Sequence, residues 1–272
     1  MKRRKFLCTA YILCALITLI FCYGFISSYE VSYFLGIQIQ PAQRIASDCE
    51  TLNIAMVIAG YETTNRAVIL LKSILFYYQQ RIHFHFITDH RSMDVLPKLF
   101  NTWQLADVEY SFYNSTNYIN RVNWIPNNHY SKHFGLIKLL LADILPEDVK
   151  KVLLLDTDLL IVGEIQELID SFSKLTNGKL YGLVENMSRW YTTQDPIHHV
   201  WPALGSGFNT GVALINLDAM RKIRWNHIWR TVAEENLKYY GRTMLADQDI
   251  INAIFVQNPH FIHRLPCKRF IQ

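Results

Sequence analysis

The chain has 272 residues, of which 50% are hydrophobic and 18% charged, so it can fill the core of one large globular domain. Its formal net charge is only +4, and residues 2–5 supply four of the basic side chains. Because no arginine-rich arm or basic stripe follows, the composition argues against a nucleic-acid-binding protein.

Residues 6–26 contain no charged side chain, and a stretch of this length can span a bilayer. The basic cluster precedes it, which predicts a cytosolic tail at 1–5 and a transmembrane signal-anchor at 6–26. A cleaved signal peptide is the alternative, but its apolar region is usually shorter and ends in small residues at a cut site. Residues 27–50 show no strong periodicity and indicate a stem, which leaves 51–272 for the folded domain.

This orientation would place the domain across the membrane from the cytosol. Asn114 and Asn186 each begin an Asn-x-Ser/Thr sequence and would then be glycosylation acceptors. Cys49 and Cys267 would lie in an oxidising compartment. Whether they form a disulfide stays open, because two cysteines so far apart predict nothing without geometry.

From Asn53 onward, short apolar runs alternate with segments of helical periodicity. We expect strands at 54–59, 83–88, 108–112, 152–159, 180–184 and 211–215. We expect helices at 63–78, 93–100, 134–145, 164–174, 225–239 and 247–255. This alternation predicts βαβ units and an α/β fold with a mostly parallel sheet.

The aliphatic run at 152–155 is typical of a strand buried on both faces, and two carboxylates follow it, Asp156 and Asp158. Residues two apart on a strand point the same way, so both carboxylates would face one point. Open α/β sheets bind ligands beyond the carboxyl ends of their strands. Oxygen donors there suit Mg²⁺ or Mn²⁺ bridging to phosphates, although an Asp after a strand often only caps the next turn.

A phosphatase of the haloacid dehalogenase type also carries Asp-x-Asp after a hydrophobic strand, with the first Asp as nucleophile. There the motif begins the fold, whereas here about a hundred residues of α/β pattern precede Asp156. Asp158 is also followed by Leu159 and Leu160 rather than the usual Thr. This reading is therefore the weaker one.

Two further polar segments are candidates for the same site. Asn209 stands in an expected turn before the strand at 211–215, where it is either a sugar-binding amide or part of a polar strand edge with a bulge. Asp247, Gln248 and Asp249 begin an expected helix, either as capping residues or as groups that recognise hydroxyls and stabilise a cationic sugar carbon.

The aromatic and histidine residues are less informative. Trp190, Tyr191 and Trp201 could stack on a sugar, but loop aromatics more often seal the edge of a core. His129 and His133 are spaced like zinc ligands on a helix, yet no adjacent Glu or partner Cys accompanies them. We interpret them as ordinary histidines.

The order Asp156-Thr157-Asp158, Asn209-Thr210-Gly211 and Asp247-Gln248-Asp249 resembles glycosyltransferase family 8. Longer strings resemble the xylosyltransferase half of the LARGE proteins, among them 124–131, 183–186, 201–205 and 265–267. The resemblance runs from about Asn53 to Cys267. It implies a GT-A, Rossmann-like nucleotide-sugar fold.

The resemblance implies a retaining enzyme that uses Mn²⁺, with Mg²⁺ possible, and moves xylose from UDP-xylose to a glucuronic-acid-terminated glycan. For the xylosyltransferase half of the LARGE proteins, this glycan is matriglycan, which is carried by the O-mannosyl glycans of α-dystroglycan. The expected location is the Golgi membrane, as a single-pass type II protein with a lumenal catalytic domain. Expected partners are the UDP-sugar, the glycan acceptor, the membrane, and a second copy or another Golgi enzyme.

The resemblance also assigns roles to individual residues. Asp156 and Asp158 match the metal-binding carboxylates of the family. The positions that match catalytic groups are Lys138, Asp247 and Gln248. The positions that match nucleotide-sugar contacts are Ala59, Gly60, Asn65, Asp156 and Asn209.

Two features of the LARGE proteins are not found in this sequence. They are the second glycosyltransferase domain and a downstream histidine that acts as third metal ligand. We therefore expect weakened metal binding, and the alternative function is a catalytically weak or inactive membrane-anchored relative that binds a glycan or an enzyme.

Overall fold

The computed structural model describes residues 51–192 and 200–266, which belong to the unit Asp48–Gln272. The predicted cytosolic tail, signal-anchor and stem, and both Cys49 and Cys267, lie outside the described residues. Among the described residues, no helix combines the length and the apolar character needed to cross a membrane.

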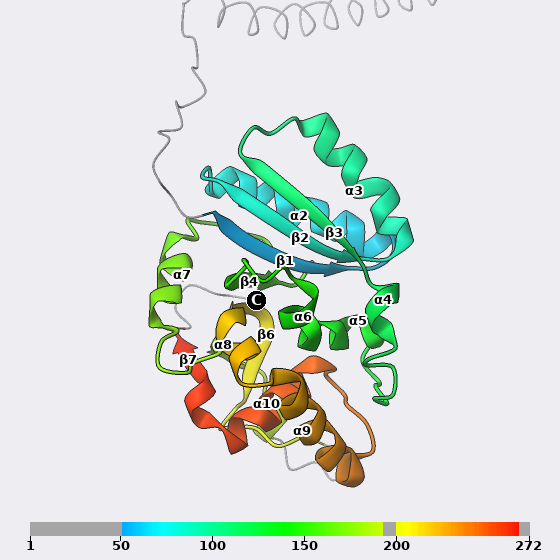
Figure 1. The fold of residues 1–272 in the computed structure, drawn as a ribbon, viewed down its shortest axis with the longest axis vertical. Coiled ribbons are helices and arrows are strands. Elements are labelled where there is room, and N and C mark those ends of the chain that lie inside the picture. Colours follow the sequence, from blue (N-terminus) through cyan, green and yellow to red (C-terminus); the bar gives the residue numbers. More distant parts are fainter. Residues whose placement is uncertain (1–50, 193–199, 267–272) are drawn as a thin grey trace, which may run out of the picture. The chain divides into compact units, whose positions relative to one another are not determined.

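A seven-stranded sheet in the order β3-β2-β1-β4-β6-β5-β7 forms the centre of the described part of the chain (Figure 1). Its strands are β1 (Leu52–Ile58), β2 (Ile82–Thr88), β3 (Val108–Asn114), β4 (Lys151–Leu155), β5 (Tyr181–Glu185), β6 (Phe208–Asn216) and β7 (Ile262–Leu265). Only β6 runs against its neighbours, since it pairs antiparallel with both β4 and β5. The predicted α/β fold with a mostly parallel sheet is confirmed.

Helices cover both faces of this sheet. They are α2 (Tyr61–Tyr77), α3 (His90–Trp103), α4 (Thr116–Ile119), α5 (His133–Leu136), α6 (Leu141–Ile144), α7 (Gln166–Asp170), α8 (Leu217–Lys222), α9 (Trp225–Tyr240) and α10 (Asp247–Gln257). The 3₁₀ turns are η1 (Ile137–Leu140), η2 (Ser171–Lys174), η3 (Trp190–Thr192) and η4 (Pro259–Phe261). Figure 1 shows α2 and α3 beside β1–β3, α8 beside β4, and α10 beside β6 with α9 next to it.

The buried side chains form two cores, one on each face. Successive residues of β1 alternate between them: Ile54 and Met56 pack with α2 and α3, whereas Ala55 packs with the η1, α9 and α10 residues. This alternation follows from the two-residue repeat of a strand. Because both faces are buried at the centre of the sheet, the central strands β1 and β4 are almost continuously apolar.

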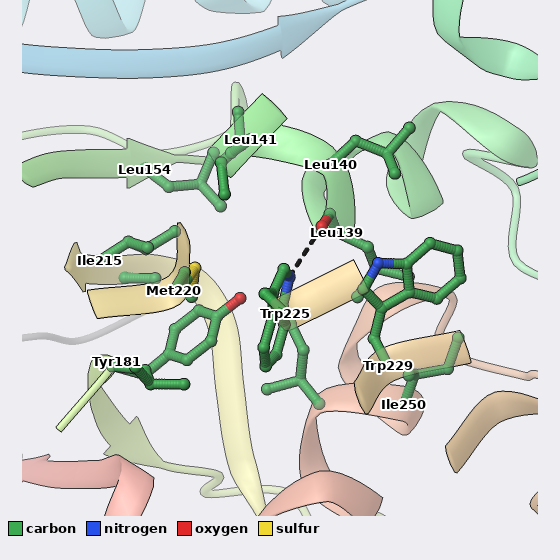
Figure 2. Packing of buried hydrophobic residues seen from close by; sticks show 14 of the residues in the cluster. Leu139, Leu140, Leu141, Leu154, Tyr181, Ile215, Met220, Trp225, Trp229 and Ile250 are labelled. Atoms are coloured by element: carbon green, nitrogen blue, oxygen red, sulfur yellow. Dashed lines mark hydrogen bonds between the residues drawn. The ribbon is translucent and has the colours of Figure 1, made fainter. Parts of the chain in front are cut away.

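The core that contains Ala55 includes three tryptophans, Trp201, Trp225 and Trp229, whose indole N–H groups are all hydrogen-bonded. Figure 2 shows Trp225 with its indole N–H directed to the carbonyl of Leu139, at an N···O distance of 2.9 Å. The Trp225 ring lies 5.8 Å from the ring of Tyr181. Hydrogen-bonding its N–H removes the main cost of burying a tryptophan, so this contact fixes η1 against α9.

The prediction of one helix at 134–145 was wrong. The segment is α5, then the 3₁₀ turn η1, then α6, with Leu140 at φ −98° and ψ 2° between them. The segment expected as a helix at 164–174 is likewise α7 followed by η2. Apolar spacing predicted helical turns in both places but not their tighter i→i+3 bonding, which this pattern does not distinguish.

The expected turn around Asn209 was also wrong, because β6 begins at Phe208 and Asn209 lies within it. The register between β5 and β6 shifts here: Leu183 pairs with Ala213, but Val184 pairs with Asn209. Residues 210–212 are therefore extra on the β6 side. The irregularity resembles the bulged strand edge given above as the alternative for Asn209.

Candidate active site

The two aspartates of the Asp-Thr-Asp motif lie in a turn, because β4 ends at Leu155. The argument that they share a strand face was therefore wrong, although they do stand at the carboxyl edge of the sheet. The Asp156 N–H donates to the carbonyl of Gly211 at 2.8 Å, which ties the start of this turn to β6. Asp158 is exposed.

Lys138 connects Asp156 to Asp247. Its Nζ lies 2.6 Å from Asp156 Oδ1 and 3.8 Å from Asp247 Oδ1, and its side chain is only 10% exposed. Burial alone would lower the lysine pKa, but the two carboxylates outweigh it and raise the pKa above its usual value. Lys138 is thus a permanent positive charge between two predicted site carboxylates, and η1 supplies it.

Asp247 is the first residue of α10 and is 3% exposed. Its Oδ2 has no hydrogen-bond partner among the described residues. Burial raises the pKa of this carboxyl to about 6, opposed by Lys138 and reinforced by Asp156. The N-cap position is Ala246 and α10 has no side-chain cap, so Asp247 does not serve as the helix cap.

The other two residues of Asp-Gln-Asp have different partners. Gln248 Oε1 accepts the N–H of Thr210 at 3.2 Å, which holds α10 to the irregular part of β6. Asp249 accepts the backbone N–H groups of Met244 and Leu245 and also the Tyr191 hydroxyl. Asp249 is therefore a structural carboxylate, whereas Asp247 keeps an oxygen free.

A cavity of about 220 Å³ opens where β5 and β6 shift register. It is lined by Val184, Glu185, Asn186, Met187, Ser188, Asn209 and Val212. Pockets for drug-sized ligands are roughly 300–1,000 Å³, so this space suits a smaller group such as one sugar ring. Apart from Asn209, sequence reasoning did not place these residues in a ligand site, because the cavity depends on strand register.

The two possible glycosylation sites differ in exposure. Asn114 is exposed at the end of β3, and Asn186 is 9% exposed in the cavity wall, with its Oδ1 accepting the Ser188 N–H at 3.1 Å. Glycosylation of either residue stays a prediction.

The first strand and loop lie at the same edge as Asp156, because β1 and β4 are parallel neighbours. Gly60 follows β1 with φ +83°, a conformation that favours glycine, and its N–H donates to Asp89 Oδ2 at 3.1 Å. Ala59 is adjacent, and Asn65 is exposed on α2. Asp89 was not predicted, although Asp before a helix with Ser92 three residues later is a capping signal.

We interpreted His129 as an ordinary histidine from the sequence. In the structure, the charges of Asp156 and Asp158 both influence the pKa of its ring. Burial lowers its pKa, Lys138 lowers it further, and the two aspartates oppose the shift. Its Nδ1 is 2.7 Å from Ser131 Oγ. Trp201, by contrast, is 1% exposed and donates to the Arg242 carbonyl, so it seals the core.

Residues 33–265 match the family model described as glycosyl transferase family 8. The xylosyl- and glucuronyltransferase LARGE1 of Danio rerio is 46% identical over 226 residues, which is 83% of this chain and 30% of the relative. LARGE1 of Homo sapiens is 44% identical over 226 residues, again 83% of this chain and 30% of the relative. The chain thus spans about 30% of the length of these curated relatives.

Among solved structures, mouse xyloside xylosyltransferase 1 in its apo form has a TM-score of 0.65 at 22% identity, covering 80% of this chain and 86% of that one. The galactosyltransferase LgtC with donor and acceptor sugar analogues has a TM-score of 0.57 at 19% identity, covering 78% and 73%. These likenesses confirm a GT-A-like fold. With the family model matching most of its length, the chain belongs to glycosyltransferase family 8.

Proposed function

We propose that this chain transfers xylose from UDP-xylose to a glucuronic-acid-terminated glycan, with retention of configuration. The observation that carries the proposal is the ion-paired arrangement of Asp156, Lys138 and Asp247, with Asp156 following β4 at the carboxyl edge of the sheet. The printed names of the relatives, xylosyl- and glucuronyltransferase, support xylose as the transferred sugar.

The residues present fit a divalent cation that is shared with the substrate. Asp156 and Asp158 offer hard oxygen donors, and residues 51–192 and 200–266 hold no group of three or more His, Cys, Asp or Glu side chains that could cage a metal. Mg²⁺ and Mn²⁺ suit sites made of one or two carboxylates completed by phosphate oxygens. Such a cation, with Mn²⁺ proposed first, would offset the charge of the leaving diphosphate.

The remaining groups would act on the sugar and its leaving group. Lys138 keeps a positive charge beside Asp156, where negative charge develops on the diphosphate. Asp247 Oδ2 is buried and has no hydrogen-bond partner among the described residues, and we propose that it accepts a hydrogen bond from a sugar hydroxyl when the donor is bound. A carboxylate also stabilises a positively charged sugar carbon. Gln248 and Asn209 place amides close by, at α10 and in the cavity.

We further propose that the protein acts in the Golgi as a single-pass type II membrane protein, on α-dystroglycan-type O-mannosyl glycans. The uncharged stretch at 6–26 after a basic cluster supports this location. A second copy or another Golgi enzyme is the proposed partner.

The test is xylose transfer to a glucuronic-acid-terminated acceptor, with and without Mn²⁺, by the purified chain and by Asp158→Ala. Loss of the cation site removes several kcal/mol of charge stabilisation, so we expect transfer to fall by at least about a hundredfold. Asp218→Ala is the matched control, because its ion pair with Lys222 on α8 is solvent-exposed. Full Mn²⁺-dependent transfer by Asp158→Ala would refute the assignment.

One observation favours the alternative of a catalytically weak glycan- or enzyme-binding relative. Within the described residues, Asp156 and Asp158 belong to no larger set of metal-ligating side chains. On this alternative, the wild-type chain binds the glycan acceptor but neither transfers xylose nor hydrolyses UDP-xylose with Mn²⁺ present.

A further inference from the structure

Asp89 connects two loops that follow neighbouring strands. It stands between β2 and α3, and its Oδ1 accepts the Ser92 N–H at 3.0 Å and the Ser92 hydroxyl at 2.7 Å, which caps α3. Its Oδ2 accepts the Gly60 N–H at 3.1 Å, from the loop that follows β1. Burial would raise the pKa of this carboxyl, but these hydrogen bonds outweigh it, so the pKa is lower than usual. One oxygen is thus sufficient for the cap, and the other holds the loop after β1.

Gly60 has a backbone conformation that strongly favours glycine. Its φ is +83° and its ψ is 164°, in a region that other residues adopt only under strain. Its carbonyl accepts the N–H and the hydroxyl of Thr64 at 3.0 and 2.8 Å, so both sides of the residue are held. No described residue lies within 4 Å of a Cβ built on Gly60. The loop is therefore fixed beside open space, and a ligand can approach its backbone closely.

The strand order indicates which part of the donor would lie beside Gly60. In the sheet β4 lies between β1 and β6, and the chain leaves β1 toward β2 on the other side. The carboxyl ends of β1 and β4 thus form a topological switch point, where open α/β sheets bind ligands. Asp156 follows β4, and Gln248 is bound to Thr210 of β6. The proposed function places the diphosphate at Asp156 and the sugar beside Gln248, which leaves the β1 side for the nucleoside.

We propose that Asp89 is a positioning residue for the nucleoside of the donor: it holds the backbone of Ala59 and Gly60 in the conformation that the nucleoside contacts. The inference rests on the proposed glycosyl transfer, because that function supplies the UDP-sugar. Asp89 acts through Gly60, since both of its oxygens already accept hydrogen bonds within the protein. The charged groups assigned to the sugar and its leaving group lie on other elements, Lys138 on η1 and Asp247 on α10. A change at Asp89 should therefore weaken donor binding and leave the chemical step intact.

The competing explanation is that Asp89 only begins α3, and two variants separate it from positioning. Ser92→Ala removes the hydroxyl bond to Oδ1 but leaves the Gly60 bond to Oδ2. Thr64, whose hydroxyl also contacts Ser92 Oγ at 3.1 Å, keeps its bond to the Gly60 carbonyl. Asp89→Asn does the reverse. With its one amide oxygen still capping α3, its Nδ2 faces the Gly60 N–H, and two donors form no hydrogen bond.

The test is the binding of UDP to the purified chain with Mn²⁺ present, measured by isothermal titration calorimetry. We expect Asp89→Asn to raise the UDP Kd about tenfold, the effect of losing one hydrogen bond to a charged group, and Ser92→Ala to change it by less than about twofold. Gly60→Ala strains the same loop and should raise the Kd at least as much as Asp89→Asn. Gly178→Ala is its control, because Gly178 also has a positive φ, +78°, with no described residue within 4 Å of a Cβ.

Kinetics and thermal unfolding distinguish positioning from general damage. Asp89→Asn should raise the UDP-xylose KM about tenfold and keep kcat within about twofold of wild type, since only binding common to the ground and transition states is lost. Asp89→Asn and Ser92→Ala should both lower the Tm, because each removes one hydrogen bond of the Asp89 side chain. The two variants thus share a loss of stability and differ in nucleotide affinity.

An unchanged UDP Kd in both Asp89→Asn and Gly60→Ala, with wild-type protein that binds UDP, would overturn the role of Asp89 alone. An equal rise of the Kd in Ser92→Ala and Asp89→Asn would also overturn it, because Asp89 would then act only as the cap of α3. Wild-type protein that binds no UDP with Mn²⁺ present would instead overturn the proposed function.

Discussion

The two ends of the sheet are built differently. At one end, β1, β2 and β3 pair in parallel and in unbroken register, with seven residues matched across each pair. At the other, β6 is reversed, β5 and β6 slip by several residues, and side-chain amides and carboxylates hold the backbone. The regular end provides stability through apolar packing. The irregular end holds the cavity, where individual hydrogen bonds decide the shape.

Removing core volume from the regular end should affect stability alone. Phe86 is fully buried and packs against Phe84, Phe100 and Phe112. We expect Phe86→Ala to lower the free energy of unfolding by about 3–5 kcal/mol. Urea denaturation measures this, with the exposed Phe76→Ala as control. A changed acceptor KM in folded Phe86→Ala protein would contradict the division between the two ends.

Removing the central charge of the site should affect both stability and activity. Lys138→Met leaves the buried Asp247 without its cation. Breaking a fully buried pair costs about 3–5 kcal/mol, and because Asp156 is partly exposed we expect roughly 2 kcal/mol here. Adding Asp247→Asn should recover most of the stability but none of the transfer. A destabilisation of the double variant equal to the sum of those of Lys138→Met and Asp247→Asn alone would show that the two side chains are not coupled.

The smallest expected effect is the pH dependence from His85 at the regular end. His85 is fully buried between Asn53 and Tyr113, and burial lowers its pKa to about 4. As pH falls below 6.5, the unfolded chain binds a proton that the folded chain does not, so stability decreases until about pH 4. Between about pH 7.5 and 5.5 the decrease should be about 1 kcal/mol. His85→Gln should remove this part of the pH dependence, and an unchanged slope would refute the assignment.

The same contrast explains what the sequence could predict. Short apolar runs predicted β1, β2 and β3, and the helical spacing of apolar residues predicted the helices between them. The short β7, with His263 and Arg264 among its four residues, leaves no such pattern and was missed. Likewise, the sequence does not tell that Asp249 is fully hydrogen-bonded within the protein whereas Asp247 keeps one oxygen without a partner among the described residues. This difference depends on the direction in which the first turn of α10 points each side chain. Motif order identified the carboxylates of the site but not the partners of each oxygen.

Because β6 carries three surplus residues beside β5, the width of the cavity that we propose for a sugar depends on chain length as well as on side-chain identity. Because side chains alternate along a strand, deleting one residue between Asn209 and Ala213 would turn Asn209 toward the opposite face. Deleting two would restore its direction while narrowing the space beside Val184. Paired deletions or insertions at 210–212 are thus a way to retune which sugar ring is accommodated while Asp156 and Asp158 keep their sequence.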